Sequence, residues 1–469
     1  MKPNNIIALS AFILAACANN NQTSILDKAF QQADSVITSI KQPEFCTDTF
    51  SIVNFGASIN ADALKNQQAI NSAIDSCSVT GGGCVLIPQG EWLTAPIELK
   101  SNVNLIISEG ATLKFSKRYE DYLPAVLTRW EGVDCYNLKP QIYAYQATNI
   151  AITGKGIIDG QGSKENWWYM KGRAQYGWTD GLISQELTGR PRLLEADQNE
   201  TPVEERVMGI EDGLRPQLIN IYNCQSVLIE GVTLRNSPFW TIHPLMVTDL
   251  IVRNVTIEGE GPNSDGCDPE SCRNVLIEGC SFNTGDDCIA IKSGRNYDGR
   301  RWNIPSENII IRNCTMKNGH GGVVLGSEIS GGYKNLWVEN CKMNSPELER
   351  VIRIKTSDCR GGVIENVYVR NIEVGECQEA ILKVNLLYEP KEICNRDFPP
   401  TVRNINLENI NSQKSKYGVY IIGLPNSNNV SDINIRNCNF DGVTDGNSIT
   451  DAQNINFSNV KINNKEIAE

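Results

Sequence analysis

Four short motifs in the middle of the chain carry side chains that suit hydrolytic chemistry. They are Asn263-Ser264-Asp265, Gly285-Asp286-Asp287, Gly319-His320-Gly321 and Arg353-Ile354-Lys355. Grouped carboxyl groups can act together in hydrolysis, one as a protonated general acid and another as an ionised general base that activates water. Crowded carboxylates raise the pKa of one member, which keeps an acid protonated near working pH. We therefore predict that Asp265, Asp286 and Asp287 are catalytic.

Each of these residues also has a plainer interpretation. An Asp-Asp pair can be a solvated turn or a calcium ligand, but an Asn-x-Asp motif at a similar position in the preceding repeat favours catalysis. His320 is one of two histidines, and isolated histidines are usually structural. Because His320 stands between two glycines beside the aspartates, we predict that it also belongs to the catalytic residues and that it tunes the aspartates or contacts substrate. We expect His243 to be structural.

Two cations follow the acidic motifs. Arg353 and Lys355 flank Ile354 on one expected strand, so both side chains point to the same face. Surface solvation is the alternative, yet the pair suits the carboxylate of a uronic acid, which Arg can bind with two hydrogen bonds. We predict Arg353, Lys355, Lys292 and Asn263 as substrate-binding residues. The net charge of −12 argues against nucleic acid as a ligand, and an anionic ligand would need a locally basic groove.

The elements that must position these residues are repeated. From about residue 100 the chain returns to short β-branched runs that end in Asn or Gly followed by a small apolar residue, such as NVLIEGCSF, NIIIRNCTM and NLWVENCKM. These apolar markers are 22 to 38 residues apart, as expected for the coils of a solenoid. The markers are Val232, Val255, Cys280, Cys314, Cys341, Ile372, Ile410, Cys438 and Val460.

Alternation of apolar and polar residues indicates strands with one buried face, and Asn or Gly at the corners tolerates a left-handed backbone. We therefore predict an all-β fold, a right-handed parallel β-helix, in which similar offsets after the markers bring the four motifs onto one face. Residues 66–77 have helical spacing and should form a short N-terminal capping helix. The marker cysteines should form an internal stack of small side chains rather than disulfides.

One stretch interrupts the repeat, from about residue 160 to 215. Long insertions in solenoids project from one face and often build the binding site. Its aromatic residues Trp167, Trp168, Tyr169 and Trp178 could stack on sugar rings or form the core of a packed loop. The sequence does not favour either role.

The N-terminus is typical of export. Residues 1–17 resemble a lipoprotein signal peptide whose lipobox ends at Cys17. We expect a lipid anchor at Cys17, a tether and N-terminal segment over 18–45, and a β-helix catalytic domain over 46–469. The protein should then be periplasmic or attached to the outer membrane or cell surface.

The cysteines do not suggest a metal site. Without Cys17, fifteen cysteines remain of the sixteen, an odd number, so at least one thiol should be free. Cys77 with Cys84, or Cys267 with Cys272, could form disulfides, but the sequence does not determine the pairing. No zinc-like cluster is evident, and we predict no metal and no cofactor.

In this order, the four motifs resemble the signatures of glycoside hydrolase family 28, the polygalacturonases and their relatives. The resemblance extends to FSIVNFGA near residue 51, GGGCVLIPQG near 81 and NSPFWTIHP near 236, and so covers nearly the whole expected mature chain. Ser264 stands where threonine is common in the family, and Cys267 where an aliphatic residue is common. Neither change affects the expected mechanism.

The resemblance implies that Asp286 is the general acid and that Asp265 and Asp287 position and deprotonate water. It implies an inverting hydrolase of α-1,4-galacturonosyl bonds in pectin, and the insertion favours exo action. Rhamnogalacturonan or xylogalacturonan is the alternative substrate. A calcium-dependent lyase is the alternative enzyme, and a non-catalytic carbohydrate-binding β-helix is the alternative from another class. We expect a monomer whose partner is an acidic polysaccharide.

Overall fold

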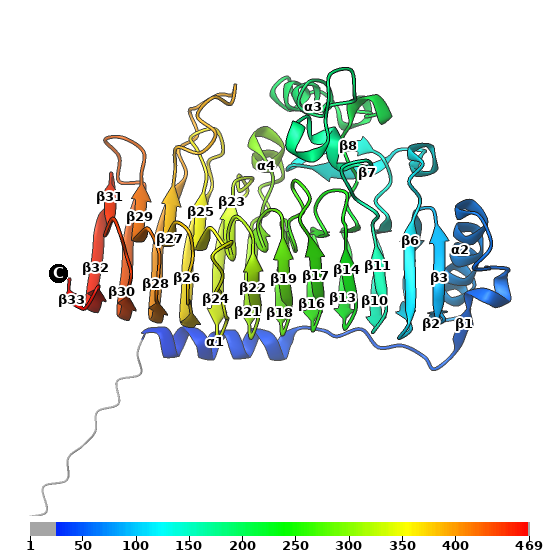
Figure 1. Ribbon diagram of the computed structural model, residues 1–469, viewed down its shortest axis with the longest axis horizontal. Coiled ribbons are helices and arrows are strands. Elements are labelled where there is room, and N and C mark those ends of the chain that lie inside the picture. Colours follow the sequence, from blue (N-terminus) through cyan, green and yellow to red (C-terminus); the bar gives the residue numbers. More distant parts are fainter. Residues whose placement is uncertain (1–24, 468–469) are drawn as a thin grey trace, which may run out of the picture.

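The computed structural model describes residues 25–467 and is a right-handed parallel β-helix. Its coils stack along one long axis in sequence order (Figure 1). Residues 1–17, Cys17 and the tether of the expected lipoprotein lie outside the described residues. The largest sheet has fourteen strands: β1 (Thr49–Ser51), β2 (Gly83–Ile87), β5 (Val103–Ile107), β10 (Thr148–Gly154), β13 (Gln225–Glu230), β16 (Thr248–Arg253), β18 (Arg273–Glu278), β21 (Ser306–Arg312), β24 (Tyr333–Glu339), β26 (Val363–Glu373), β28 (Thr401–Ser412), β30 (Val430–Phe440), β32 (Gln453–Ile462) and β33 (Lys465–Glu466).

Three further parallel sheets complete the coils. A seven-stranded sheet contains β3 (Gly90–Thr94), β6 (Ala111–Phe115), β11 (Ile157–Asp159), β14 (Thr233–Arg235), β17 (Thr256–Gly259), β19 (Ser281–Thr284) and β22 (Thr315–Asn318). A four-stranded sheet contains β4 (Ile97–Leu99), β9 (Ile142–Tyr145), β12 (Ile219–Tyr222) and β15 (Ile242–Leu245). A six-stranded sheet contains β20 (Ile289–Ile291), β23 (Val323–Gly326), β25 (Arg350–Lys355), β27 (Ala380–Asn385), β29 (Tyr417–Ile422) and β31 (Ser448–Thr450). The segment from Cys267 to Glu270 bridges the last two sheets into one face.

The corners of the coils follow the expected chemistry. Each of the nine markers comes directly after an Asn or Gly with positive φ, such as Asn313 (56°) before Cys314. Corner amides of adjacent coils bond to each other, as Asn409 Nδ2 does to Asn371 Oδ1 at 3.2 Å. All nine markers are at most 3% exposed and belong to one continuous apolar core. The predicted stack of buried marker cysteines is confirmed.

Two helices cover apolar surface of the solenoid. Helix α2 (Ala63–Val79) packs on the first strands and confirms the predicted capping helix. Helix α1 (Ile25–Ser39) runs along the outer face of the fourteen-stranded sheet, on the opposite side of the molecule from helix α3 (Gly189–Gln198) (Figure 1). Leu26 and Phe30 of α1 belong to a buried cluster with Trp337 of β24. Among residues 25–467, no helix has both the length and the apolar character that crossing a bilayer requires.

Several excursions project from the coils on the side opposite α1, among them the three that follow (Figure 1). The first is an antiparallel hairpin of β7 (Val126–Trp130) and β8 (Val133–Asn137). The second is the predicted insertion, which contains α3. The third includes helix α4 (Asn296–Trp302), which follows β20.

The described cysteines form one disulfide, between Cys359 and Cys394. Neither pair considered from the sequence is formed, since Cys77, Cys84, Cys267 and Cys272 are all free thiols. The predicted free thiol is confirmed.

Candidate active site

The site lies at the corner where the seven-stranded sheet passes into the six-stranded sheet. Asp265 follows β17, Asp286 and Asp287 follow β19, and His320 follows β22. Backbone hydrogen bonds stack these turns, including Gly266 N to Asp287 O at 3.0 Å and His320 N to Asp286 O at 3.1 Å. A Cβ added at Gly319 would lie 2.6 Å from Asp286 O, so this tight stacking requires glycine there.

The three predicted aspartates meet in one cluster, with one carboxylate oxygen from each within 4.8 Å of the others. Asp265 and Asp287 are buried, while the side chain of Asp286 is 16% exposed and faces the pocket. The cluster supplies the several carboxyl groups that glycosidic hydrolysis needs, and inversion is an expectation from the family resemblance.

The other predicted residues surround this cluster. His320 Nδ1 lies 2.9 Å from Asp286 Oδ1, and Asn263 Nδ2 lies 3.5 Å from Asp286 Oδ2. On the other side, Lys355 Nζ lies 2.7 Å and Arg353 Nη1 3.5 Å from the carboxylate of Asp287. Without a ligand, both cations therefore pair with an aspartate of the cluster.

Lys292 lies nearby but has a different partner. Its Nζ is 3.0 Å from Glu328 Oε2 and 4.5 Å from the centre of the Trp240 ring. Burial alone would lower the pKa of Lys292, but the carboxylates of Glu328, Asp268 and Asp265 raise it well above its usual value. Lys292 is therefore a permanent charge at the edge of the aspartate cluster.

The pKa values of Asp265 and Asp286 are shifted in opposite directions. Burial, followed by the charges of Asp268 and Asp286, raises the pKa of Asp265 well above its usual value. Burial also acts to raise the pKa of Asp286, but His320, Lys355 and Lys292 together outweigh it and hold the pKa below its usual range. In return, the Asp286 carboxylate raises the pKa of His320 to about 9. Burial and neighbouring carboxylates therefore favour the protonated form of Asp265, whereas the contact with His320 favours the ionised form of Asp286.

Sequence reasoning did not identify Asp268 as part of this group. Asp268 is fully buried, and among the described residues neither of its carboxylate oxygens has a hydrogen-bond partner. Burial raises its pKa well above the usual value, which favours the neutral form of this carboxyl beside the cluster. In the sequence, its position three residues after Asp265 could have indicated that it belongs to the site.

The aspartates open into a cavity of about 440 Å³. Its lining includes seven Lys or Arg and seven Asp or Glu residues in an otherwise acidic chain, so the groove is richer in cations than the whole protein without being net basic. The insertion contributes Lys171, Arg173, Tyr176, Glu186 and Arg190, and the segment after β27 contributes Tyr388 and Glu389. A larger cavity, about 620 Å³, lies between the hairpin and the coil corners and contains none of the predicted site residues.

The aromatic residues of the insertion support the packed-loop interpretation. Trp167 is fully buried in a cluster with Tyr122, against which Trp168 and Tyr169 pack. None of these three, nor Trp178, lines the cavity around the aspartates. His243 is fully buried with its Nε2 2.8 Å from Glu270, so its predicted structural role is confirmed.

Comparisons with known proteins agree with this geometry. The model of glycosyl hydrolases family 28 matches residues 210–464. A crystal structure of a hyperthermoactive exopolygalacturonase from Thermotoga maritima is 38% identical, with a TM-score of 0.89 over 93% of this chain and 96% of its own. The exo-poly-alpha-D-galacturonosidase of Dickeya chrysanthemi is 26% identical over 88% of this chain and 71% of its own. The endo-polygalacturonase of Pectobacterium parmentieri is 26% identical over 87% and 90%, respectively. The chain therefore belongs to glycoside hydrolase family 28.

Proposed function

We propose that this glycoside hydrolase cleaves α-1,4-galacturonosyl bonds of pectin from the chain end, by an inverting mechanism and without a cofactor. The observation that carries the proposal is the aspartate cluster beside Arg353 and Lys355 in one pocket. Carboxylates supply acid and base, and the cations suit a sugar that carries its own carboxylate.

In this proposal Asp286 protonates the leaving oxygen, while Asp265 and Asp287 hold and deprotonate the attacking water. His320 contacts Asp286 and tunes it. Arg353 and Lys355, which pair with Asp287, also bind the carboxylate of a galacturonate unit. Lys292 and Asn263 complete the substrate contacts at the edge of the cluster.

The acid role requires a proton on Asp286 in the substrate complex. One source within the cluster is Asp265, whose pKa is raised and whose oxygen lies within 4.8 Å of an oxygen of Asp286. Because closely coupled carboxylates titrate as a group, a proton on one member is available to the others. A bell-shaped pH profile would report the group and not a single residue.

Product analysis tests the reaction class. Digestion of polygalacturonate with chelator present should yield new reducing ends without unsaturated sugars. Unsaturated products that require calcium would instead indicate a lyase. Digesting rhamnogalacturonan and xylogalacturonan in parallel, and sizing all products over time, distinguishes substrate and mode, while NMR of the first-formed anomer tests inversion.

We also propose that the protein is an exported monomer with a lipid on Cys17. In support, α1 begins at Ile25, a few residues after the proposed anchor, and packs on the side opposite the pocket-lining insertion (Figure 1). An anchor there would leave the groove facing away from the membrane. Cys17→Ala should move the protein from the membrane to the soluble fraction, and a membrane fraction unchanged by this variant would refute the anchor. Gel filtration tests the monomer.

A further inference from the structure

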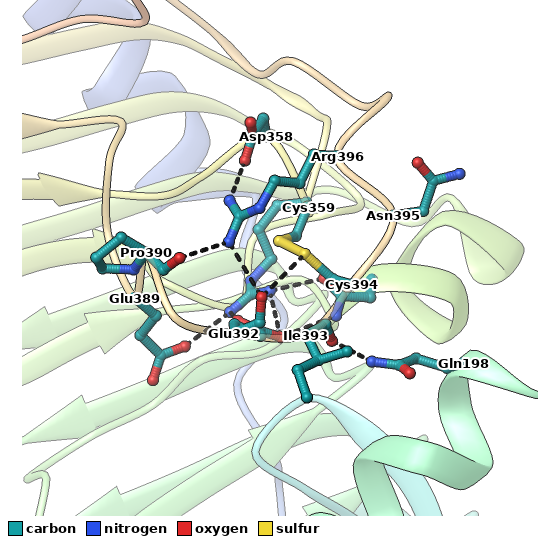
Figure 2. Close-up of a disulfide and its surroundings, with 12 residues drawn as sticks. Gln198, Asp358, Cys359, Glu389, Pro390, Glu392, Ile393, Cys394, Asn395 and Arg396 are labelled. Carbon is teal, nitrogen blue, oxygen red and sulfur yellow. Dashed lines mark hydrogen bonds and ion pairs between the residues drawn. A yellow bond between two sulfur atoms is a disulfide. The ribbon is translucent and has the colours of Figure 1, made fainter.

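The segment between β27 and β28 forms a loop fastened to its neighbour at several points. We call residues 386–398 the disulfide loop, because Cys394 is bonded to Cys359 (Figure 2). Backbone bonds tie both ends of this loop to the segment after β25, with Tyr388 N donating to Thr356 O at 3.1 Å and Phe398 N to Asp358 O at 3.0 Å. The disulfide loop is therefore held at a defined position beside the catalytic pocket.

Glu389 is the point where this loop meets the rest of the pocket wall. Its carboxylate pairs with Arg190 at 3.3 Å, Arg295 at 2.8 Å and Arg360 at 3.1 Å. These arginines come from the insertion, the start of α4 and the segment after β25. Arg295 and Arg360 are almost completely buried, and a buried charge is costly without a partner.

Glu392 supplies a second set of contacts to the same cations, 3.0 Å from Arg295 and 2.8 Å from Arg360. The loop therefore remains attached through Glu392 even without Glu389. Arg190 is different, because among the described residues its ion pairs are limited to Glu389 and Glu131.

The Arg190–Glu389 pair joins two segments that reach the pocket from different coils. The insertion leaves the solenoid after β11, two coils before Asp265, whereas Glu389 follows β27, one coil beyond Arg353. Both Arg190 and Glu389 line the pocket. A second contact supports the same junction, since Gln198 of α3 donates to the carbonyl of Ile393 (Figure 2).

We propose that Arg190 and Glu389 form a latch that joins the insertion to the disulfide loop and closes the pocket wall, so that a chain end enters but a chain interior does not. The Cys359–Cys394 disulfide holds the Glu389 half of the latch in place. The latch extends the proposed function, and its expected effect on product size rests on that function. The latch itself can be tested without substrate.

The first test measures amide hydrogen exchange in the free enzyme. In Glu389→Ala, exchange should accelerate several-fold in peptides covering 189–198, whose Arg190 and Gln198 contact the loop. In Cys359→Ala/Cys394→Ala, exchange should accelerate mainly in 386–398. The matched control removes a surface pair far from the pocket, Arg403–Glu365, and should change neither segment. Unchanged exchange of 189–198 in Glu389→Ala would overturn the latch whatever the activity of the enzyme.

The second test uses Arg190→Ala/Glu389→Ala on long polygalacturonate, following viscosity and reducing ends together. We expect viscosity loss per bond cleaved to rise several-fold over wild type, with oligomers of mixed length among the early products. Wild-type product sizes from an active double variant would overturn the latch and leave the hydrolase function intact. Absence of reducing ends from wild type would overturn the proposed function, and the exchange data would then decide the latch alone.

Discussion

Replacing Asp286 with Asn removes one ionisable group while nearly preserving the shape of the side chain. If Asp286 is the general acid, kcat on polygalacturonate should fall by about 10²- to 10⁴-fold. KM should change little, because the cations that hold the substrate pair with Asp287 and not with Asp286. The matched control is Asp445→Asn, which alters an exposed carboxylate and should keep wild-type kinetics.

The same substitution has a second readout that does not depend on turnover. In wild type, Asp286 raises the pKa of His320 from 6.5 to about 9 across a contact of 2.9 Å. Without that carboxylate, the pKa of His320 should move back toward 6.5, so that the ring becomes largely neutral at pH 8.

Histidine NMR can follow this change, because the chain has only one other histidine. The buried His243 has a lowered pKa, so its signals should not titrate in the same range. A kcat within tenfold of wild type would refute the role of Asp286 as the acid. A titration of His320 that stays near pH 9 in the variant would refute the electrostatic reasoning.

Three further predictions concern stability. Lys355→Met leaves the buried Asp287 with fewer cationic partners, so the free energy of unfolding by denaturant should fall by about 3 kcal/mol. In the control Lys334→Met, which breaks an exposed pair, it should fall by less than about 1 kcal/mol. Equal losses in the two variants would contradict this reasoning. The pKa of His320 is raised on folding, so the stability that this residue contributes is complete below pH 6.5 and is lost as the pH rises through about 9. The Tm difference between wild type and His320→Gln should therefore shrink over that interval. A Tm difference independent of pH would argue against the ion pair with Asp286. Phe30→Ala leaves a cavity between α1 and the sheet, so limited proteolysis should remove helix α1 faster while the Tm of the solenoid changes little. Resistance to proteolysis equal to that of wild type would show that other contacts hold the helix.

Much of the fold could be predicted because its contacts repeat. Asn313 and Cys314 illustrate the rule, since a left-handed corner followed by a small buried residue occurs at nine similar positions. In a solenoid each coil packs mainly on the coils next to it, so a local pattern with a regular interval is sufficient to place strands and corners. The same regularity predicted that Asp265 and Asp286 would lie together.

Features without a period could not be predicted in this way. Helix α1 was not expected from the sequence. Its apolar face packs on outward-facing residues of the sheet, such as Trp337, which are scattered through the chain and form no sequence pattern. The two disulfides considered on the basis of proximity in sequence are not formed, while Cys359 and Cys394, 35 residues apart, are joined. The geometry of a disulfide depends on backbone positions that sequence separation does not specify.

The sequence by itself determined the coiled architecture, the family resemblance and which ionisable side chains share a face, because these follow from residue type and spacing between neighbouring coils. Only the tertiary structure decided how those groups interact. It buried Asp265 so that its pKa is raised, paired Lys355 with Asp287 and joined Arg190 to Glu389 across 199 residues of sequence. The physical reason is that pKa values and ion pairs depend on burial and on distances of a few ångströms, which are set by side chains arriving from several coils at once.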